Sequence, residues 1–198
     1  MMAYSIGLTG SIGMGKSTTA NLFAAEGVPT WDADAVVHRL YAPGGAAVAP
    51  LRAIVPNAIR DNAVDRELLR EAVLADPSLL KQVEVAVHPL VAGDRANFLA
   101  TAKAPIVLFD IPLLFETGQA GLYDSVVVAS APAPVQHARV LERPGMTEEA
   151  FQAILAKQVP DAEKRARADH VIDTSRGIEA ARDQVRAVLG VIRGKLNA

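Results

Sequence analysis

The residues that decide the fold of this chain are Gly10-Ser11-Ile12-Gly13-Met14-Gly15-Lys16-Ser17. They match the pattern G-x-x-x-x-G-K-[ST], whose glycines let backbone N–H groups converge on phosphate oxygens. The apolar stretch Tyr4–Thr9 before them predicts a buried strand, and Lys16–Glu26 after them predicts a helix. Strand, glycine-rich loop and helix form the context that this pattern requires. We therefore predict a phosphate-binding loop, called the P-loop below, at Gly10–Ser17.

The P-loop predicts which groups would hold a nucleoside triphosphate. Lys16 is expected to place its ammonium on the β- and γ-phosphates, and the Ser17 hydroxyl is expected to bind Mg²⁺. The following helix adds partial positive charge at its N-terminus. The alternative is a glycine-rich turn with a solvated lysine, which the flanking strand and helix disfavour. The predicted nucleotide-binding residues are Gly10, Ser11, Ile12, Gly13, Met14, Gly15, Lys16, Ser17 and Thr18, together with Arg143.

Composition is typical of a globular protein and excludes several functions. The 198 residues fit one domain with room for a small inserted lid. Hydrophobic residues make up 51% and aromatic residues only 5%, so the core should be aliphatic. A net charge of −2 indicates no general affinity for nucleic acids, and the lack of cysteine excludes disulfides and thiolate catalysis. No run of about 18 uncharged apolar residues predicts a membrane span, and no signal peptide is evident, so a cytoplasmic location is expected.

Apolar stretches and helix signals alternate along the chain. Further strands are expected at Val28–Trp31, Ile106–Ile111, Tyr123–Ala129 and His170–Asp173. Helices are expected at Asp32–Tyr41, Asp65–Leu74, Asp76 to about Ala102 with a bend at Pro89, Pro134–Glu142, Thr147–Gln158, Ala162–Ala168 and Ile178–Arg193. Ala46–Asp61 is expected to be a connection. The predicted fold class is therefore α/β, a P-loop kinase-type three-layer sandwich with helices on both faces of a five-stranded parallel sheet.

Two aspartates follow the second predicted strand, at the sheet edge where the P-loop is expected. A P-loop alone does not identify the reaction, but the N-K-x-D guanine motif is absent and the chain is short, so small-molecule kinases remain. Such a kinase needs a group that accepts or orients the proton of an acceptor hydroxyl. Asp32 is the candidate for that catalytic role, and Asp34 is a candidate substrate contact. The alternative is a helix N-cap, which the aspartates taken alone favour; beside a P-loop the two interpretations are about equally favoured.

Other candidate site residues lie farther along the chain. Asp110 ends the third predicted strand, where it would either complete the Mg²⁺ shell or serve as a turn residue. Leu113, Leu114 and Phe115 either belong to the core or line an acceptor pocket. His88 is a candidate contact for an anionic acceptor, although a lone histidine is more often packed or solvated.

A cluster of cations predicts a lid that closes over the transferring phosphate. Arg139 and Arg143 lie four residues apart, at a helix end and in the following turn, and Arg139 joins Lys16 as a candidate catalytic residue. Further cations follow at Lys157, Lys164, Arg165 and Arg167. The alternative for each of them is a solvated helix face, which we expect at least for Arg165 or Arg167.

Five blocks, in this order, resemble those of the dephospho-coenzyme A kinase family over nearly the whole chain. The P-loop is shared by many families, whereas the later blocks are more specific. The blocks are Ile6–Ser17, Asp32-Ala33-Asp34, His88-Pro89-Leu90, Asp110-Ile111-Pro112-Leu113-Leu114-Phe115-Glu116, and Gln158 with Lys164–Asp169 and Val171-Ile172-Asp173. The chain departs from the family pattern at Ile154 and Thr174, where many members carry arginine and asparagine.

The resemblance implies ATP-dependent phosphorylation of the ribose 3′-hydroxyl of dephospho-CoA, giving CoA and ADP. It implies Asp32 as the base or orienting carboxylate, with Arg139 and Arg143 on the ATP and lid side. It implies a core at about 1–45, 103–142 and 168–198, a helical CoA-binding insertion at about 46–102 and a lid at about 143–160. The expected partners are ATP, Mg²⁺ and dephospho-CoA, with no nucleic acid or membrane, and the expected state is a monomer or weak homo-oligomer. The alternatives are another small-molecule kinase, for nucleoside monophosphates or shikimate-like alcohols, and a non-enzymatic nucleotide-binding module.

Overall fold

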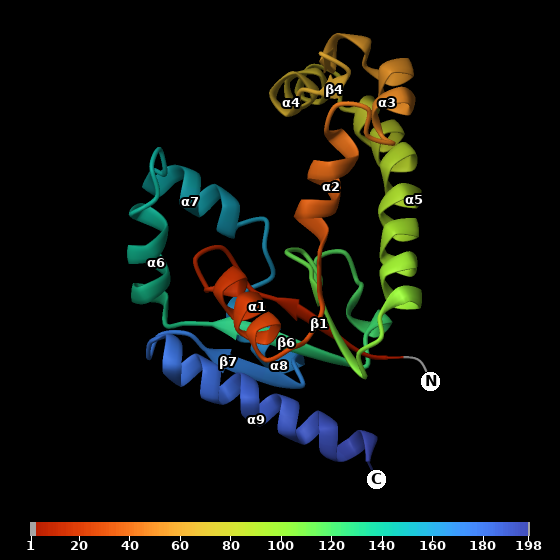
Figure 1. Ribbon diagram of the computed structural model, residues 1–198. Helices are drawn as coiled ribbons and strands as arrows, with labels where there is room; N and C mark the ends of the chain where they lie inside the picture. The colour runs from red at the N-terminus through yellow and green to blue at the C-terminus, as the bar shows by residue number, and fades with distance from the viewer. Residues whose placement is uncertain (1–2, 198) are drawn as a thin grey trace. The chain divides into compact units, whose positions relative to one another are not determined.

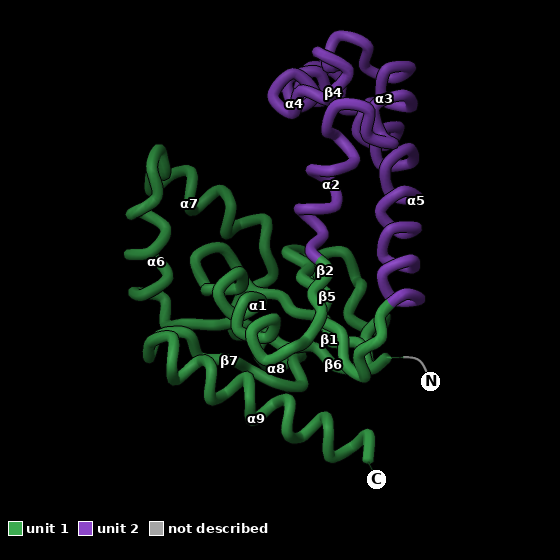
Figure 2. The backbone as a smooth tube through the Cα atoms, viewed as in Figure 1, with its two compact units in different colours: residues 1–31, 102–198 green, residues 32–101 purple. Residues whose placement is uncertain are grey.

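The computed structural model describes residues 3–197. These residues form two compact units, which are described separately (Figure 2). The sheet unit comprises the residues up to Trp31 and from Ala102 onward, and the helical unit is Asp32–Thr101. The helical unit therefore begins before the insertion expected at about 46–102 and ends one residue earlier.

A five-stranded parallel sheet forms the centre of the sheet unit (Figure 1). In spatial order its strands are β2 (Thr30–Asp32), β5 (Ile106–Asp110), β1 (Tyr4–Thr9), β6 (Ser125–Ser130) and β7 (His170–Asp173). Ile6 of β1 lies opposite Leu108 of β5, and Leu8 lies opposite Val127 of β6. The P-loop leaves the carboxyl end of the central strand β1, where parallel sheets bind their ligands. The predicted α/β fold class is confirmed.

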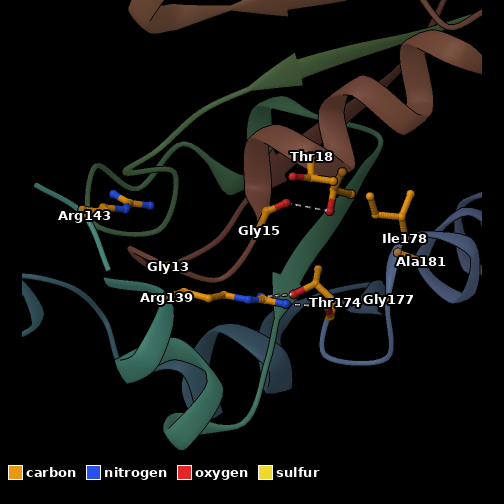
Figure 3. Close-up of a pocket in the computed structure, with 10 residues that line it drawn as sticks. Gly13, Gly15, Thr18, Arg139, Arg143, Thr174, Gly177, Ile178 and Ala181 are labelled. Carbon is orange, nitrogen blue, oxygen red and sulfur yellow. Dashed lines mark hydrogen bonds between the residues drawn. The ribbon is translucent and has the colours of Figure 1, made fainter. Parts of the chain in front are cut away.

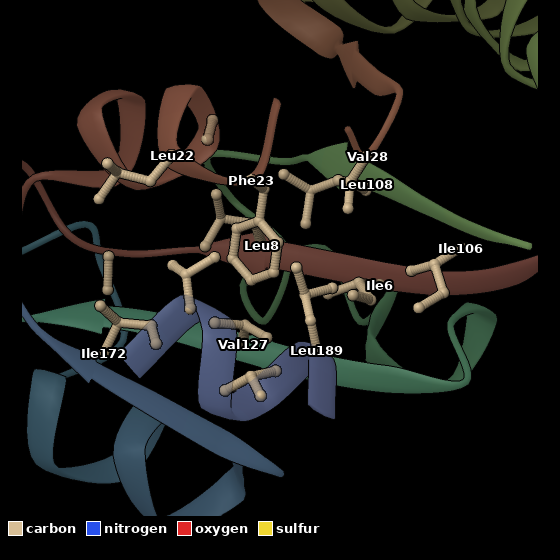
Figure 4. Packing of buried hydrophobic residues seen from close by; sticks show 14 of the residues in the cluster. Ile6, Leu8, Leu22, Phe23, Val28, Ile106, Leu108, Val127, Ile172 and Leu189 are labelled. Atoms are coloured by element: carbon tan, nitrogen blue, oxygen red, sulfur yellow. The ribbon is translucent and has the colours of Figure 1, made fainter. Parts of the chain in front are cut away.

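One face of this sheet is covered by α1 (Lys16–Ala25) and α9 (Ile178–Leu196), which contact each other (Figure 4). Successive strand side chains point to opposite faces, so Ile6 and Leu8 share one face. They pack in one cluster with Phe23 of α1 and Leu189 of α9, and all four side chains are fully buried. Apart from Phe23, the buried members of this cluster are aliphatic, as the composition predicts.

The opposite face is covered in part by the segment that follows β5. Gly7 of β1 points to this face, where an added Cβ would lie 2.7 Å from Tyr123 Cδ2 and 2.8 Å from Leu114 Cδ1. Only glycine allows this close approach. The remaining elements of the sheet unit are the 3-10 helix η2 (Ala120–Leu122), α6 (Ala133–Leu141), α7 (Glu148–Leu155) and α8 (Asp161–Arg167).

The helical unit has a core of its own, in which Leu51 and Ala47 are fully buried and Val83 and Val87 of one long helix pack against them. That long helix, α5, runs without interruption through Pro89. The elements of the unit are α2 (Ala33–Tyr41), α3 (Val48–Ile54), η1 (Pro56–Ala58), β3 (Ile59–Arg60), β4 (Ala63–Val64), α4 (Arg66–Ala75) and α5 (Ser78–Thr101).

The expectation that Ala46–Asp61 is only a connection is wrong. The segment contains α3, η1 and β3, and β3 pairs with β4 in a two-stranded hairpin. Asp61 and Asn62 form its turn with φ of 48° and 57°, a left-handed conformation that these residue types tolerate best after glycine. The helix α3 has only seven residues, so its stability comes from burying Val48 and Leu51 and leaves little signal in the sequence.

Candidate nucleotide-binding site

The P-loop has the backbone conformation that its glycines permit. Gly13 and Gly15 have φ of 77° and 84°, in the left-handed region that disfavours other residues. A Cβ at Gly13 would also lie 2.5 Å from Val140 Cγ2 of α6. The loop is therefore held against α6 at a distance that only glycine allows.

The first turn of α1 is open to a ligand. Gly15 is the N-cap, and no side chain caps the helix. The N–H groups of this turn have no partner within the helix and carry the positive end of its dipole. Ser17 and Thr18 are exposed in the same turn. Free donors, hydroxyl groups and partial positive charge together make this turn suitable for binding an anion.

Lys16 and Asp110, both predicted from the sequence as site residues, are joined directly. The Lys16 ammonium lies 2.5 Å from Asp110 Oδ1. The Lys16 side chain is 16% exposed and that of Asp110 is 5% exposed, so the pair is largely shielded from water. A phosphate that binds the P-loop would therefore compete with Asp110 for the lysine.

A cavity of about 270 Å³ adjoins the P-loop within the sheet unit (Figure 3). Its walls come from the P-loop, the start of α1, the end of α6, the turn after α6, the connection between β7 and α9, and the start of α9. The residues that line it are Gly13, Gly15, Thr18, Thr19, Arg139, Arg143, Thr174, Gly177, Ile178 and Ala181. The cavity thus combines P-loop backbone with two guanidinium groups and the apolar side chains of α9.

Arg139 is held in place at the wall of this cavity. Its Nη1 donates to Thr174 Oγ1 at 2.9 Å, and its Nη2 donates to the Thr174 carbonyl at 2.7 Å (Figure 3). The Thr174 hydroxyl in turn lies 2.9 Å from the carbonyl oxygen of Met14 in the P-loop. Thr174, which departs from the family pattern, therefore links Arg139 to the P-loop.

The comparisons with known proteins agree along the length of the chain. A family model described as Dephospho-CoA kinase matches residues 4–180. The dephospho-CoA kinase of Cereibacter sphaeroides is 58% identical over 198 residues and covers 100% of both chains. The chain belongs to the dephospho-CoA kinase family.

Two further proteins that are similar to this dephospho-CoA kinase support the family assignment. The dephospho-CoA kinase of Ruegeria pomeroyi is 54% identical, with 100% of both chains covered. A crystal structure of a Thermus thermophilus protein is 34% identical and superimposes with a TM-score of 0.84, covering 96% of this chain and 98% of the other. The resemblance predicted from the sequence blocks is confirmed, and the chain is an enzyme of this kind.

The three predicted acceptor-side residues Asp32, Asp34 and His88 all lie in the helical unit and are exposed. Asp32 is the N-cap of α2, and its Oδ1 accepts the Ala35 N–H at 3.0 Å. The capping role weighed as the alternative is therefore present, and it occupies one carboxylate oxygen. The roles of these three residues toward an acceptor stay predictions.

Of the three apolar candidate residues after β5, two are buried in the core and one lies at the surface. Leu114 is fully buried and Phe115 is 5% exposed, which favours the core interpretation for both. Leu113 is 45% exposed and is the one of the three whose side chain a ligand can reach.

The expectation that Lys164 serves as a lid cation is wrong. Lys164 is fully buried, and its ammonium lies 2.8 Å from Glu116 Oε1. Arg167 lies over the Phe115 ring, with its guanidinium carbon 4.5 Å from the centroid, and pairs with Glu163. Arg143 is exposed at the cavity.

Sequence reasoning missed several residues of this site. Gln136 and Thr174 contact the P-loop, and neither was among the predicted site residues. Gln158 and Glu116 carried a signal, since both belong to blocks that resemble the family. Within residues 3–197, no group of three or more metal-ligating side chains would hold an ion by itself, and no helix is long and apolar enough to cross a membrane.

Proposed function

We propose that this enzyme transfers the γ-phosphoryl group of ATP to the ribose 3′-hydroxyl of dephospho-CoA, giving CoA and ADP. The observation that carries the proposal is the P-loop cavity in a chain that matches dephospho-CoA kinases along its length. A P-loop binds the triphosphate, and the family membership assigns the acceptor.

The sheet unit would supply the phosphate-binding groups. The P-loop N–H groups and the Lys16 ammonium stabilise negative charge on the phosphoryl oxygens, because fixed donors need no reorganisation during the reaction. Mg²⁺ enters with ATP as part of the substrate, and the exposed Ser17 hydroxyl and the Asp110 carboxylate are oxygen ligands of the kind it prefers. Arg139 and Arg143 line the same cavity and would face the nucleotide.

Asp32 is proposed as the residue that accepts or orients the proton of the 3′-hydroxyl. Its Oδ1 caps α2, which leaves Oδ2 for this role. We also propose that the helical unit, with Asp34 and His88, contributes contacts to the acceptor, with Leu113 as a contact from the sheet unit, and that residues 143–160 act as a lid.

A coupled assay of ADP release tests the proposal with dephospho-CoA, AMP, CMP and shikimate as separate acceptors. Stimulation by dephospho-CoA alone is the expected result. Stimulation by AMP, CMP or shikimate instead would assign the enzyme to another class of small-molecule kinase. ATP hydrolysis that no acceptor stimulates would contradict the transfer reaction.

The location of the enzyme in the cell and its oligomeric state are two further properties to be proposed. We propose a cytoplasmic location and a monomer or weak homo-oligomer, with no nucleic-acid or membrane partner. Light scattering across a range of protein concentrations measures the oligomeric state, and a stable oligomer at low concentration would contradict it.

A further inference from the structure

The backbone of Ile12 in the P-loop is held through both its carbonyl oxygen and its N–H. Its carbonyl oxygen accepts the Gln136 side-chain amide at 2.7 Å, and its N–H donates to Gln158 Oε1 at 3.2 Å. Gln136 belongs to α6, and Gln158 lies in the connection between α7 and α8. Two segments that flank α7 in the chain therefore meet at the backbone of one P-loop residue.

The backbone next to Gln158 is anchored by a buried ion pair. The Val159 N–H donates to Glu116 Oε1 at 2.9 Å, and the Lys164 ammonium lies 2.8 Å from the same oxygen. Lys164 is fully buried and the Glu116 side chain is 12% exposed. Pro160 follows and has no N–H, so the Val159 N–H is the donor that ties this connection to the loop after β5.

Stability alone does not explain this arrangement. A buried ion pair loses the hydration of both charges, and apolar side chains of similar volume often stabilise a fold as well or better. A carboxylate that accepts both an ammonium and a backbone N–H does, however, fix the position of that backbone. The pair is therefore suited to fixing the backbone position of the segment that contains Gln158.

We propose that Gln158 is a positioning residue of the P-loop, and that the Glu116–Lys164 pair holds the Gln158–Val159 backbone where Gln158 can accept the Ile12 N–H. This inference rests on the proposed function, because it concerns nucleotide binding at the same site. Every residue in this arrangement belongs to the sheet unit.

The first test replaces Gln158 with alanine and measures ADP binding by calorimetry. ADP binding needs no acceptor, so the result does not depend on which acceptor the enzyme uses. Loss of one hydrogen bond to the loop should weaken ADP binding about three- to tenfold. In steady-state assays, the KM for ATP should rise while kcat and the KM for dephospho-CoA stay unchanged.

The matched control is Gln119→Ala. Gln119 is also half-buried, and its side-chain amide donates one hydrogen bond, to Thr117 Oγ1 at 3.0 Å. This bond lies outside the P-loop, so the control should bind ADP like the wild type even if its melting temperature falls.

The second test compares two double variants that remove both buried charges. Glu116→Gln with Lys164→Met keeps an acceptor for the Val159 N–H, whereas Glu116→Leu with Lys164→Met removes it. The first should bind ADP like the wild type, and the second should weaken binding as Gln158→Ala does. The proposal is overturned if the two double variants bind ADP equally well, or if Gln158→Ala lowers the melting temperature without weakening ADP binding.

Discussion

Lys16 of the P-loop and Asp110 of β5 form an ion pair, with Nζ 2.5 Å from Oδ1. The lysine expected to contact phosphate is thus neutralised by the carboxylate expected to serve Mg²⁺. The pair suits a site that binds ATP and Mg²⁺ together, because the ATP anion attracts the lysine while the cation attracts the aspartate.

Replacing Asp110 with asparagine should separate the effect of its carboxylate on Lys16 from its effect on Mg²⁺. In the absence of Mg²⁺, ATP should bind about three- to tenfold more tightly, because Lys16 no longer has to leave a carboxylate. With Mg²⁺, kcat should fall by a factor on the order of 10², because the variant loses the charged group that we propose as a ligand of the metal. Calorimetry with and without Mg²⁺ checks the first effect, and ADP release checks the second. Asp94→Asn, which removes the charge of a half-buried partner of Arg39, should leave nucleotide binding unchanged.

Gly13→Ala should weaken nucleotide binding. The new Cβ would lie 2.5 Å from Val140 Cγ2 in a residue with φ of 77°, so the P-loop must shift. The free energy of unfolding should fall by about 1–3 kcal/mol, and ADP should bind at least about tenfold more weakly.

Gly27→Ala is the control for the backbone conformation of Gly13. Gly27 has a similar φ of 81°, but its added Cβ would meet no atom within 4 Å. It should cost about 1 kcal/mol of stability and leave ADP binding unchanged. Equal losses of binding in the two variants would show that steric contact with α6 does not shape the loop.

Asp32→Asn should lower kcat by about 10²–10⁴ and have little effect on stability. Asparagine caps helices as well as aspartate does, so the variant removes the proposed proton acceptor and keeps the cap. Asp65→Asn is the matched control, since Asp65 caps α4 in the same way. Unchanged turnover in Asp32→Asn would leave Asp32 with the capping role alone.

The Glu116–Lys164 pair predicts a pH dependence of stability. Burial alone would raise the pKa of Glu116, but hydrogen bonds from Lys164 and from backbone N–H groups outweigh it and lower the pKa below its ordinary value of 4.5. A carboxyl whose pKa is lowered by folding stabilises the native state above the unfolded-state pKa, and this contribution is lost as the pH falls through the folded-state value.

Chemical denaturation between pH 7 and pH 3 measures this contribution. As the pH falls below the ordinary pKa of glutamate, the free energy of unfolding of the wild type should decrease more steeply than that of the Glu116→Gln, Lys164→Met double variant. The double variant has no charge to titrate at these two positions. Parallel pH profiles for the two proteins would contradict an ionised pair in the folded state.

Much of the site was predictable because its signals are local. The P-loop requires glycine at Gly13 for a backbone reason, and the apolar stretch Tyr4–Thr9 fits a buried strand wherever it lies in the sheet. The strand β1 and the start of α1 accordingly lie where the sequence predicts them. The helix α3 and the hairpin at Asp61-Asn62 were missed, since such short elements depend on their packing.

The amino-acid sequence was enough to predict the phosphate-binding loop, the α/β fold class and the family, because glycine conformations and apolar stretches act over a few neighbouring residues. The contacts between distant residues are seen only in the folded chain: Lys164 is a buried partner of Glu116, Thr174 joins Arg139 to the P-loop, and Gln136 and Gln158 meet at Ile12. These contacts join residues up to 160 positions apart, and a hydrogen bond or ion pair requires atoms within about 3 Å. Such proximity exists only after the chain has folded.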